Sequence, residues 1–224
     1  MNRTALRWAL MVAVLVVATV VALYPRSEPT PTAAPRGEPE LVPGAPNVSV
    51  APELDQPYLD ELRARAALHP CPRPGPGVAA AGPLAGVVLP CLGEETTVDL
   101  GAALAGRPAL LNLWGPLCEP CREEMPALAA YGAEPGAVTV LGVEVQRLPE
   151  GGLDLMARLG VDYPSVSDPD GVLRGALRSP LVLPLTYLVS PDGRVQQVNP
   201  PEVFRDPARI RAAVVRYLAD GAVR

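Results

Sequence analysis

Short, uninterrupted apolar runs alternate with helical patterns in the second half of the chain. The runs at 109–114 and 137–145 predict strands covered on both faces, because a strand with one wet face would alternate apolar and polar residues. One helix is predicted at 118–131 and another at 153–159, the second ended by Gly160. This order of strand, helix, strand and helix predicts an α/β domain built in layers.

The pattern continues into a hairpin and a last helix. A strand predicted at 185–190 is joined to another at 194–198 by Pro-Asp-Gly at 191–193, residues typical of a tight turn. The last helix is predicted at 207–218, with Asp206 as its N-cap. Its apolar stripe consists of Ile210, Val214 and Leu218.

The first part of the chain lacks this alternation. An uncharged apolar run at 8–24 follows Arg3 and Arg7, which predicts an uncleaved signal-anchor helix with the rest of the chain exported. A cleaved signal peptide is the alternative. Eight prolines fall between residues 25 and 54, which predicts an extended spacer that cannot form a core.

A short extension separates this spacer from the α/β domain. A helix is predicted at 57–68, with Asp55 placed to cap it, and a short strand at 86–92. The predicted organisation is a signal-anchor or transmembrane helix at 1–24, a Pro-rich linker at 25–54, an N-terminal extension with a cysteine pair at 55–93 and the α/β domain at 94–224. We therefore expect a single-pass protein of the cell membrane whose α/β domain is extracytoplasmic.

Composition excludes some classes of function. The net charge of -5, without any Lys/Arg cluster, gives no reason to expect nucleic-acid binding. The single histidine, His69, excludes metal sites built from several imidazoles and is interpreted as a turn residue. The four cysteines are an even set, and disulfides form and persist outside the cytoplasm.

The sharpest chemical signal is the run Cys118-Glu119-Pro120-Cys121, which follows a buried strand and opens a helix. At a helix N-terminus the dipole and the free backbone N–H groups stabilise the thiolate of Cys118. Cys121, one turn further on, is more buried. We expect Cys118 to attack a substrate disulfide and Cys121 to resolve the mixed disulfide.

A CxxC pair also occurs in structural disulfides and in zinc sites. A zinc site would recruit Cys71, Cys91 or His69 as well, but the spacing of the four cysteines contains no second close pair. The strand before Cys118 and the helix after it favour redox chemistry. No metal and no cofactor are expected.

Three blocks of sequence point to a family: Leu111-Asn112-Leu113-Trp114, Cys118-Glu119-Pro120-Cys121-Arg122-Glu123-Glu124-Met125-Pro126, and Pro184-Leu185-Thr186-Tyr187-Leu188-Val189 with Pro191-Asp192-Gly193. They resemble the extracytoplasmic thioredoxin-like proteins of the TlpA and ResA type. The resemblance covers about residues 94 to 220. It implies a thioredoxin-like three-layer α/β fold with a central mixed sheet, and a membrane-tethered disulfide reductase.

The resemblance also implies roles for individual residues. Pro184 matches the family's cis-proline beside the dithiol, which would leave the backbone of Leu183 free to pair with an extended substrate. Glu124 matches an acidic residue that exchanges protons with the cysteines, although a solvated helix carboxylate is the alternative. Asn112 stands where cytoplasmic thioredoxins keep a buried Asp, and an amide cannot act as the base. Trp114 either flanks the site and contacts substrate or lies in the core.

Two departures and one charge refine this expectation. Leu117 stands where the family often has a second Trp, after the unusual approach Gly115-Pro116, so substrate docking does not carry over. Glu119 places negative charge beside Cys118, which opposes thiolate formation and favours a reducing dithiol. We expect a potential nearer that of thioredoxin, about -270 mV, than that of DsbA, about -120 mV.

The other couple, Cys71 and Cys91, is left to form its own bond. Such a bond would close a loop of about 20 residues and add roughly 3 kcal/mol to stability. We interpret it as a structural disulfide, with a second redox relay and free thiols as alternatives.

The predicted function is disulfide reduction or exchange on exported proteins, apocytochrome c being one substrate that the resemblance implies. It also implies a membrane thiol donor of the DsbD or CcdA kind, and membrane contact through the N-terminal helix. A thiol peroxidase is the first alternative, although no Thr precedes Cys118 as peroxidases usually require. A binding module without catalysis is the second, and a copper carrier, with Met125 the one soft ligand near Cys118, is the third.

Overall fold

The computed structural model describes residues 56–76 and 79–222. The predicted signal-anchor, the Pro-rich linker and the capping residue Asp55 lie outside these ranges. Among the described helices, none is long and apolar enough to cross a membrane.

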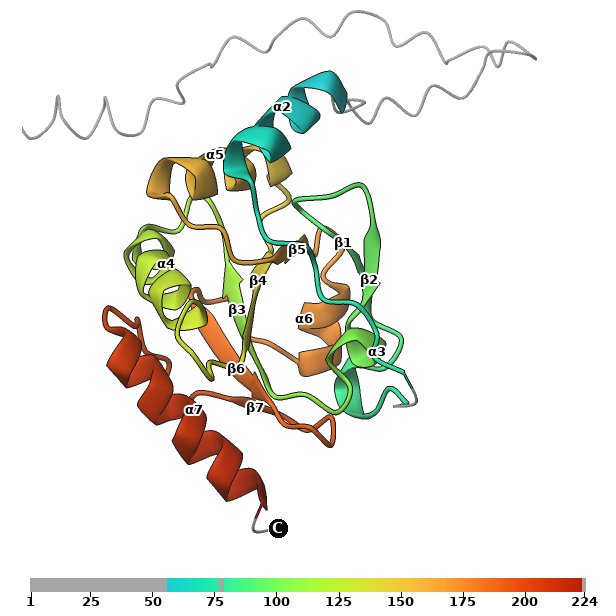
Figure 1. The fold of residues 1–224 in the computed structure, drawn as a ribbon, viewed down its shortest axis with the longest axis vertical. Coiled ribbons are helices and arrows are strands. Elements are labelled where there is room, and N and C mark those ends of the chain that lie inside the picture. The colour runs from blue at the N-terminus through green and yellow to red at the C-terminus, as the bar shows by residue number, and fades with distance from the viewer. Residues whose placement is uncertain (1–55, 77–78, 223–224) are drawn as a thin grey trace, which may run out of the picture. The chain divides into compact units, whose positions relative to one another are not determined.

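Helices and strands alternate along the chain as the pattern predicts (Figure 1). The helices are α2 (Gln56–Ala66), α3 (Leu100–Leu104), α4 (Glu119–Gly132), α5 (Pro149–Leu159), α6 (Val172–Leu177) and α7 (Pro207–Ala222), with a 3-10 turn at Gly82–Leu84. The strands are β1 (Val88–Pro90), β2 (Thr97–Asp99), β3 (Ala109–Trp114), β4 (Thr139–Glu144), β5 (Ser165–Ser167), β6 (Leu185–Val189) and β7 (Val195–Gln197).

Five strands form a central mixed sheet in the order β5-β4-β3-β6-β7. The strand β3 runs parallel to β4, with Trp114 opposite Glu144, and antiparallel to β6, with Leu113 opposite Leu185. The carboxyl end of β3 therefore lies beside the carboxyl end of β4 and the start of β6. The remaining two strands, β1 and β2, pair in a separate hairpin.

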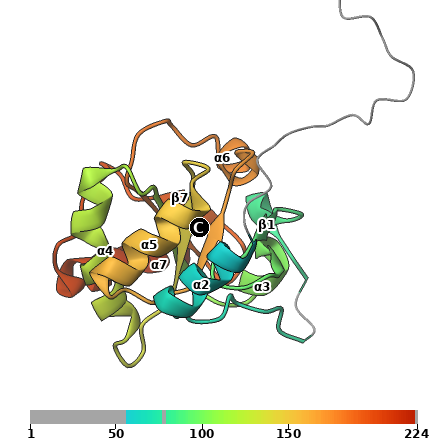
Figure 2. The ribbon, with the colours of Figure 1, turned by 90° about the horizontal axis from the view of Figure 1, so that it is seen from above.

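The sheet is covered on both faces, which makes three layers (Figures 1 and 2). Side chains of a strand point alternately to the two faces. Accordingly Leu110 and Trp114 of β3 pack in an apolar cluster with α2, α4, α5 and α7. Leu111 and Leu113 pack in a second cluster with the β1–β2 hairpin, α3 and α6. This arrangement confirms the predicted thioredoxin-like three-layer fold.

The predicted extension packs into the same body as the α/β domain. Helix α2 lies against α5 and buries Leu59, Leu62 and Ala66, which share one face of the helix. The hairpin pairs Leu89 with Val98 and so crosses the predicted boundary at 93/94. Cys91 forms a bridge to Val166 of β5, which fastens the hairpin to the edge of the sheet. No break in packing separates the two parts within the described residues.

Some elements differ from the predicted ones. Helix α5 begins at Pro149, four residues earlier than expected, because Gly151 and Gly152 hide the helical pattern of its first turn. Gly152 suits a close contact, since a Cβ there would lie 3.2 Å from Cη2 of Trp114. The elements β2, α3, β5 and α6 were not predicted, because three to six residues are too few to show a period.

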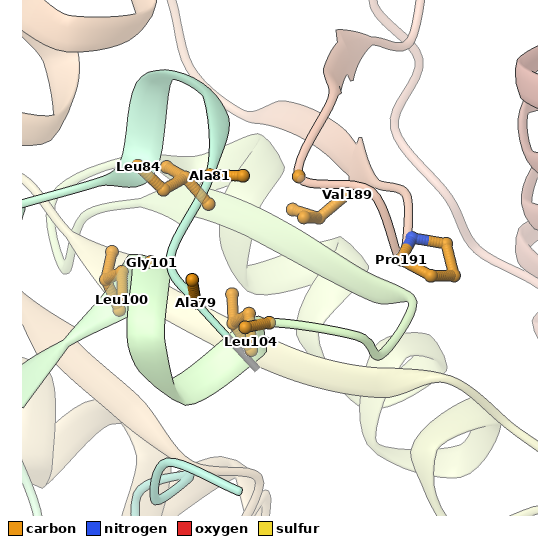
Figure 3. Close-up of a pocket in the computed structure, with 10 residues that line it drawn as sticks. Ala79, Ala81, Leu84, Leu100, Gly101, Leu104, Val189 and Pro191 are labelled. Carbon is orange, nitrogen blue, oxygen red and sulfur yellow. The ribbon is translucent and has the colours of Figure 1, made fainter. Parts of the chain in front are cut away.

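A small hollow lies at the end of the sheet remote from the end of β3 (Figure 3). It is lined by apolar residues such as Leu84, Leu104 and Val189. Val189 pairs with Ala109, the first residue of β3. The hollow encloses only ≈ 10 Å³, room for no more than one water molecule, so it holds no substrate.

Candidate active site

The dithiol lies at the junction between β3 and α4. Cys118 is the N-cap of α4, and its Sγ accepts a hydrogen bond of 3.2 Å from the backbone N–H of Cys121. Pro120 lies in the first helical turn, where a missing N–H costs no hydrogen bond. The two sulfurs form a disulfide across a separation of three residues. Cys118 is half-buried and Cys121 is buried, as expected for an attacking and a resolving thiol.

Glu124 lies one turn after Cys121 and is completely buried. Residues three apart share a helix face, so its carboxyl group lies on the side of α4 that carries Cys121. Its Oε1 accepts a hydrogen bond of 2.6 Å from Nδ2 of Asn112. Burial excludes the alternative of a solvated helix carboxylate, and the role of Glu124 in proton exchange stays a prediction.

Burial raises the pKa of Glu124 from its ordinary 4.5 to about 8. The backbone N–H of Phe204 and the hydroxyl of Thr186 lower the pKa in part, while the charge of Glu202 raises it further. The hydroxyl of Tyr163 is buried without a hydrogen-bond partner, and its pKa is raised by burial and by the charge of Glu124. A carboxyl group with this pKa can take up and release a proton near neutral pH.

The peptide bond between Leu183 and Pro184 is cis, as the resemblance implies. Leu185, the first residue of β6, pairs with Leu113 near the end of β3. Leu183 and Pro184 therefore lie just before β6, at the same edge of the sheet as Cys118. Their role in pairing with substrate stays a prediction. Trp114 is completely buried, which favours the core interpretation over contact with substrate.

The charge of Glu119 is partly compensated. Its Oε2 lies 3.0 Å from Nη1 of Arg122, although the side chain of Glu119 is largely exposed. The argument that Glu119 opposes the thiolate of Cys118 is therefore weaker than the sequence suggests, because the sequence does not reveal this partner.

Two side chains that sequence reasoning missed hold the approach to Cys118. Arg122 donates from Nε and Nη2 to the carbonyl of Pro116, at 3.2 and 2.8 Å. Gln146, in the loop after β4, accepts from the backbone N–H of Leu117 at 2.8 Å. For Arg122 the signal was its position one turn after Cys118, but nothing local indicated Gln146.

Large apolar side chains are exposed around the same edge of the sheet. Leu117 precedes the first cysteine and is 71% exposed, while Leu181 and Val182 precede the cis-proline and are 87% and 54% exposed. Leu148, in the loop after β4, is 37% exposed. The loops that carry these residues follow β3 and β4 or precede β6, so they surround the dithiol.

Cys71 and Cys91 form the second disulfide, in the pairing that the sequence predicted. Both residues are buried in the cluster with α3 and α6, on the face of the sheet opposite to α4. The backbone N–H of Cys71 donates to Oε1 of Glu94 at 2.9 Å. Two cysteines joined in this way also fit a redox site, so the structural role of this disulfide stays a prediction.

This couple is also where the described residues come nearest to a metal site. The Sγ atoms of Cys71 and Cys91 and a carboxylate oxygen of Glu94 lie within 4.8 Å of one another. In the disulfide the two sulfurs are bonded to each other, and the carboxylate of Glu94 is engaged by the N–H of Cys71 and by Arg73.

Comparison with known proteins is consistent with this site. The model of the AhpC/TSA family matches residues 86–198. The chain is 35% identical over 98 residues to the thiol-disulfide oxidoreductase ResA of Bacillus subtilis (strain 168), covering 42% of this chain and 54% of ResA. It spans a little over half the length of the first curated relatives that it matches.

Two solved structures agree with the fold. A secreted disulfide oxidoreductase of Mycobacterium tuberculosis superposes with a TM-score of 0.53 at 25% identity, covering 60% of this chain and 97% of the other. A secreted thiol-disulfide isomerase of Corynebacterium glutamicum superposes with a TM-score of 0.51 at 26% identity, covering 63% and 85%.

Proposed function

The chain belongs to the AhpC/TSA family, and from that membership and the site geometry we propose that it is a thiol–disulfide oxidoreductase working through Cys118 and Cys121. The observation that carries the proposal is the hydrogen bond of 3.2 Å from the N–H of Cys121 to Sγ of Cys118 at the start of α4. A donor aimed at this sulfur stabilises a thiolate, the reactive form of cysteine. The similarity to proteins named thiol-disulfide oxidoreductases supports the same reaction.

The reaction follows in two exchanges. The Cys118 thiolate attacks one sulfur of a substrate disulfide, so that a mixed disulfide forms and the other substrate sulfur leaves as a thiolate. Cys121, after losing its proton, then attacks Sγ of Cys118 and releases the second substrate thiolate. The substrate gains two electrons and two protons, and the protein is left with the Cys118–Cys121 disulfide. A dithiol donor returns it to the reduced state by the reverse exchange.

Glu124 provides the proton step. Cys121 is buried, so its thiol has no direct contact with bulk water when it must ionise. The ionised form of Glu124, which is the minority below its pKa of about 8, accepts that proton from the same helix face, and the carboxyl group then holds the proton until the disulfide is next reduced.

We further propose that the protein acts on exported proteins from a membrane anchor. The uncharged run at 8–24 after Arg3 and Arg7 supports the anchor, and the secreted proteins among the similar structures support an extracytoplasmic domain. The exposed apolar side chains of Leu117, Leu148 and Leu181 suit an unfolded polypeptide around its cysteines. Apocytochrome c is a substrate of this kind, and the proposed donor is a membrane thiol protein.

Equilibration with glutathione tests the direction of the reaction. We expect a potential nearer that of thioredoxin, about -270 mV, than that of DsbA, about -120 mV, and a value above about -180 mV would exclude a reductase. A Cys121→Ser variant should trap the physiological substrate as a mixed disulfide on Cys118, which mass spectrometry can identify. Peroxide consumption driven by a thiol donor, without disulfide reduction, would instead favour the peroxidase alternative.

A further inference from the structure

Of the four residues between β3 and α4, Gly115 and Pro116 are buried, Cys118 is half-buried and Leu117 is exposed. Leu117 is 71% exposed, so its side chain does not anchor the loop. The backbone of Cys118 donates to the carbonyl of Gly115 at 3.1 Å, which closes a tight turn. The groups that bind the remaining backbone atoms of that turn help to fix its orientation relative to the sheet.

Gln146, in the loop after β4, binds this turn. Its Oε1 accepts from the N–H of Leu117, the residue directly before Cys118, at 2.8 Å. Arg122 holds the carbonyl of Pro116 from the helix side. The turn is thus fastened at successive residues, once to the β4 side of the sheet and once to α4.

Glu144 holds Gln146 in turn. This carboxylate is completely buried at the end of β4, and its Oε1 accepts from the backbone N–H of Gln146 at 2.6 Å. Its Oε2 accepts from the hydroxyl of Ser167 at 3.0 Å. A charged group buried at the end of an apolar strand is costly unless it is well hydrogen-bonded, and here its bonds fix the backbone of the loop that carries Gln146.

The approach of Gln146 depends on the absence of a side chain at Gly115. A Cβ at Gly115 would lie 2.3 to 2.4 Å from Cδ, Cγ and Oε1 of Gln146. The clashing atoms belong to the end of a flexible side chain. An alanine at 115 would therefore displace Gln146 at small cost to the fold while breaking its bond to Leu117.

We propose that Gln146 is a positioning residue for Cys118: through the N–H of Leu117 it holds the turn so that Sγ of Cys118 faces the N–H of Cys121. The inference rests on the proposed function, in which Cys118 is the attacking thiol. When the turn is released, the sulfur loses its alignment with the helix N-terminus, and the thiolate loses stabilisation.

The test is the pH profile of alkylation at Cys118 in the reduced protein, followed by mass spectrometry of its peptide. Gln146→Met removes the acceptor at similar volume, and Gly115→Ala displaces the same side chain from the other side. We expect the midpoint of the profile to move up by about 0.5 to 1 pH unit in each variant, with alkylation below the midpoint about three- to tenfold slower. Gln196→Met, a half-buried glutamine of β7, is the matched control and should leave the profile unchanged.

The double variant sharpens the result. Both substitutions break the same hydrogen bond, the one between Gln146 and Leu117. The midpoint in the double variant Gly115→Ala, Gln146→Met should therefore shift by as much as it does in either single variant. An unchanged midpoint in the folded single variants, or additive shifts in the double variant, overturns the role of Gln146. A wild-type protein that alkylates at Cys118 but reduces no disulfide would refute the proposed function instead.

Discussion

The two disulfides of this protein lie on opposite faces of one sheet, and the polar groups next to their sulfurs differ in kind. The sulfur of Cys118 faces a backbone N–H at 3.2 Å, at the positive end of a helix. The sulfur of Cys71 lies 3.5 Å from a carbonyl oxygen, that of Ser165, and its backbone N–H binds the carboxylate of Glu94. A donor stabilises a thiolate, whereas an oxygen with partial negative charge disfavours it.

On the predicted roles, the neighbouring groups and the length of the closed loop together distinguish a reactive couple from a structural one. Cys118 and Cys121 are three residues apart, so their bond constrains almost nothing beyond a helical turn. Cys71 and Cys91 are 20 residues apart, and their bond ties the segment after α2 to the edge of the sheet. Exchange chemistry suits the first arrangement, and restraint of the unfolded chain suits the second.

The largest expected effect is the loss of catalysis in Cys118→Ser. Without the attacking thiolate, the rate of disulfide reduction, measured with insulin and dithiothreitol, should fall by at least about 10³-fold. The melting temperature should change little, because this disulfide closes a very short loop. A Cys71→Ser, Cys91→Ser double variant measured alongside should keep a rate within about twofold of wild type; a comparable loss there would make the second couple part of the catalytic pathway.

Removal of the Cys71–Cys91 disulfide should lower stability more than removal of the Cys118–Cys121 disulfide, the reverse of the expected effects on catalysis. Removing the Cys71–Cys91 bond by Cys71→Ala with Cys91→Ala should lower the free energy of unfolding by about 3 kcal/mol, since the closed loop is about 20 residues long. Urea denaturation of the oxidised proteins measures the change, and each Ala is close enough in volume to keep the packing. A loss well under 1 kcal/mol would contradict a structural role.

Glu124 should make the stability of the reactive side depend on pH. Its folded pKa of about 8 lies above its ordinary 4.5, so between these values the unfolded chain has released a proton that the folded protein still holds. Stability therefore falls as pH rises through this window. In Glu124→Gln that loss should disappear. As the pH rises from 5.5 to 7.5, the free energy of unfolding of the variant, measured by urea denaturation, should therefore increase by roughly 2 kcal/mol relative to that of wild type. Parallel stability profiles would mean that Glu124 is ionised in the folded state throughout.

The same variant should slow the second exchange. With no carboxylate to accept the proton of Cys121, release of substrate from the mixed disulfide should be about 10- to 100-fold slower, and raising the pH should restore part of the rate. Stopped-flow kinetics separates this step from the attack by Cys118, which should change less. Equal slowing of both steps would point to a distorted site rather than a lost proton acceptor.

Glu119 should have the smallest effect. Because Arg122 compensates its charge, Glu119→Gln should change the rate of attack by less than about twofold at moderate salt. Glu123→Gln on the same helix, where Arg205 is the partner, is the matched control. A much faster attack in Glu119→Gln alone would restore the original argument that this charge restrains the thiolate.

Local patterns predicted the parts of the fold that depend on neighbouring residues. The strand at Ala109–Trp114 was predicted to the residue, because its apolar run is long and bounded on both sides. The helix after it was predicted within one residue from the CxxC motif and Pro120. Short elements such as β5 at Ser165–Ser167 escaped prediction, because pairing with β4 alone makes them strands.

The sequence by itself determined the disulfide of Cys118 with Cys121, since the spacing of these two cysteines at a helix start is a property of consecutive residues. It also determined the pairing of Cys71 with Cys91, by elimination. Only the tertiary structure decided which polar groups meet these sulfurs. Parallel pairing of β3 with β4 brings Gln146 to Leu117 across 29 residues of chain, and no local pattern records a contact between loops that only the sheet brings together.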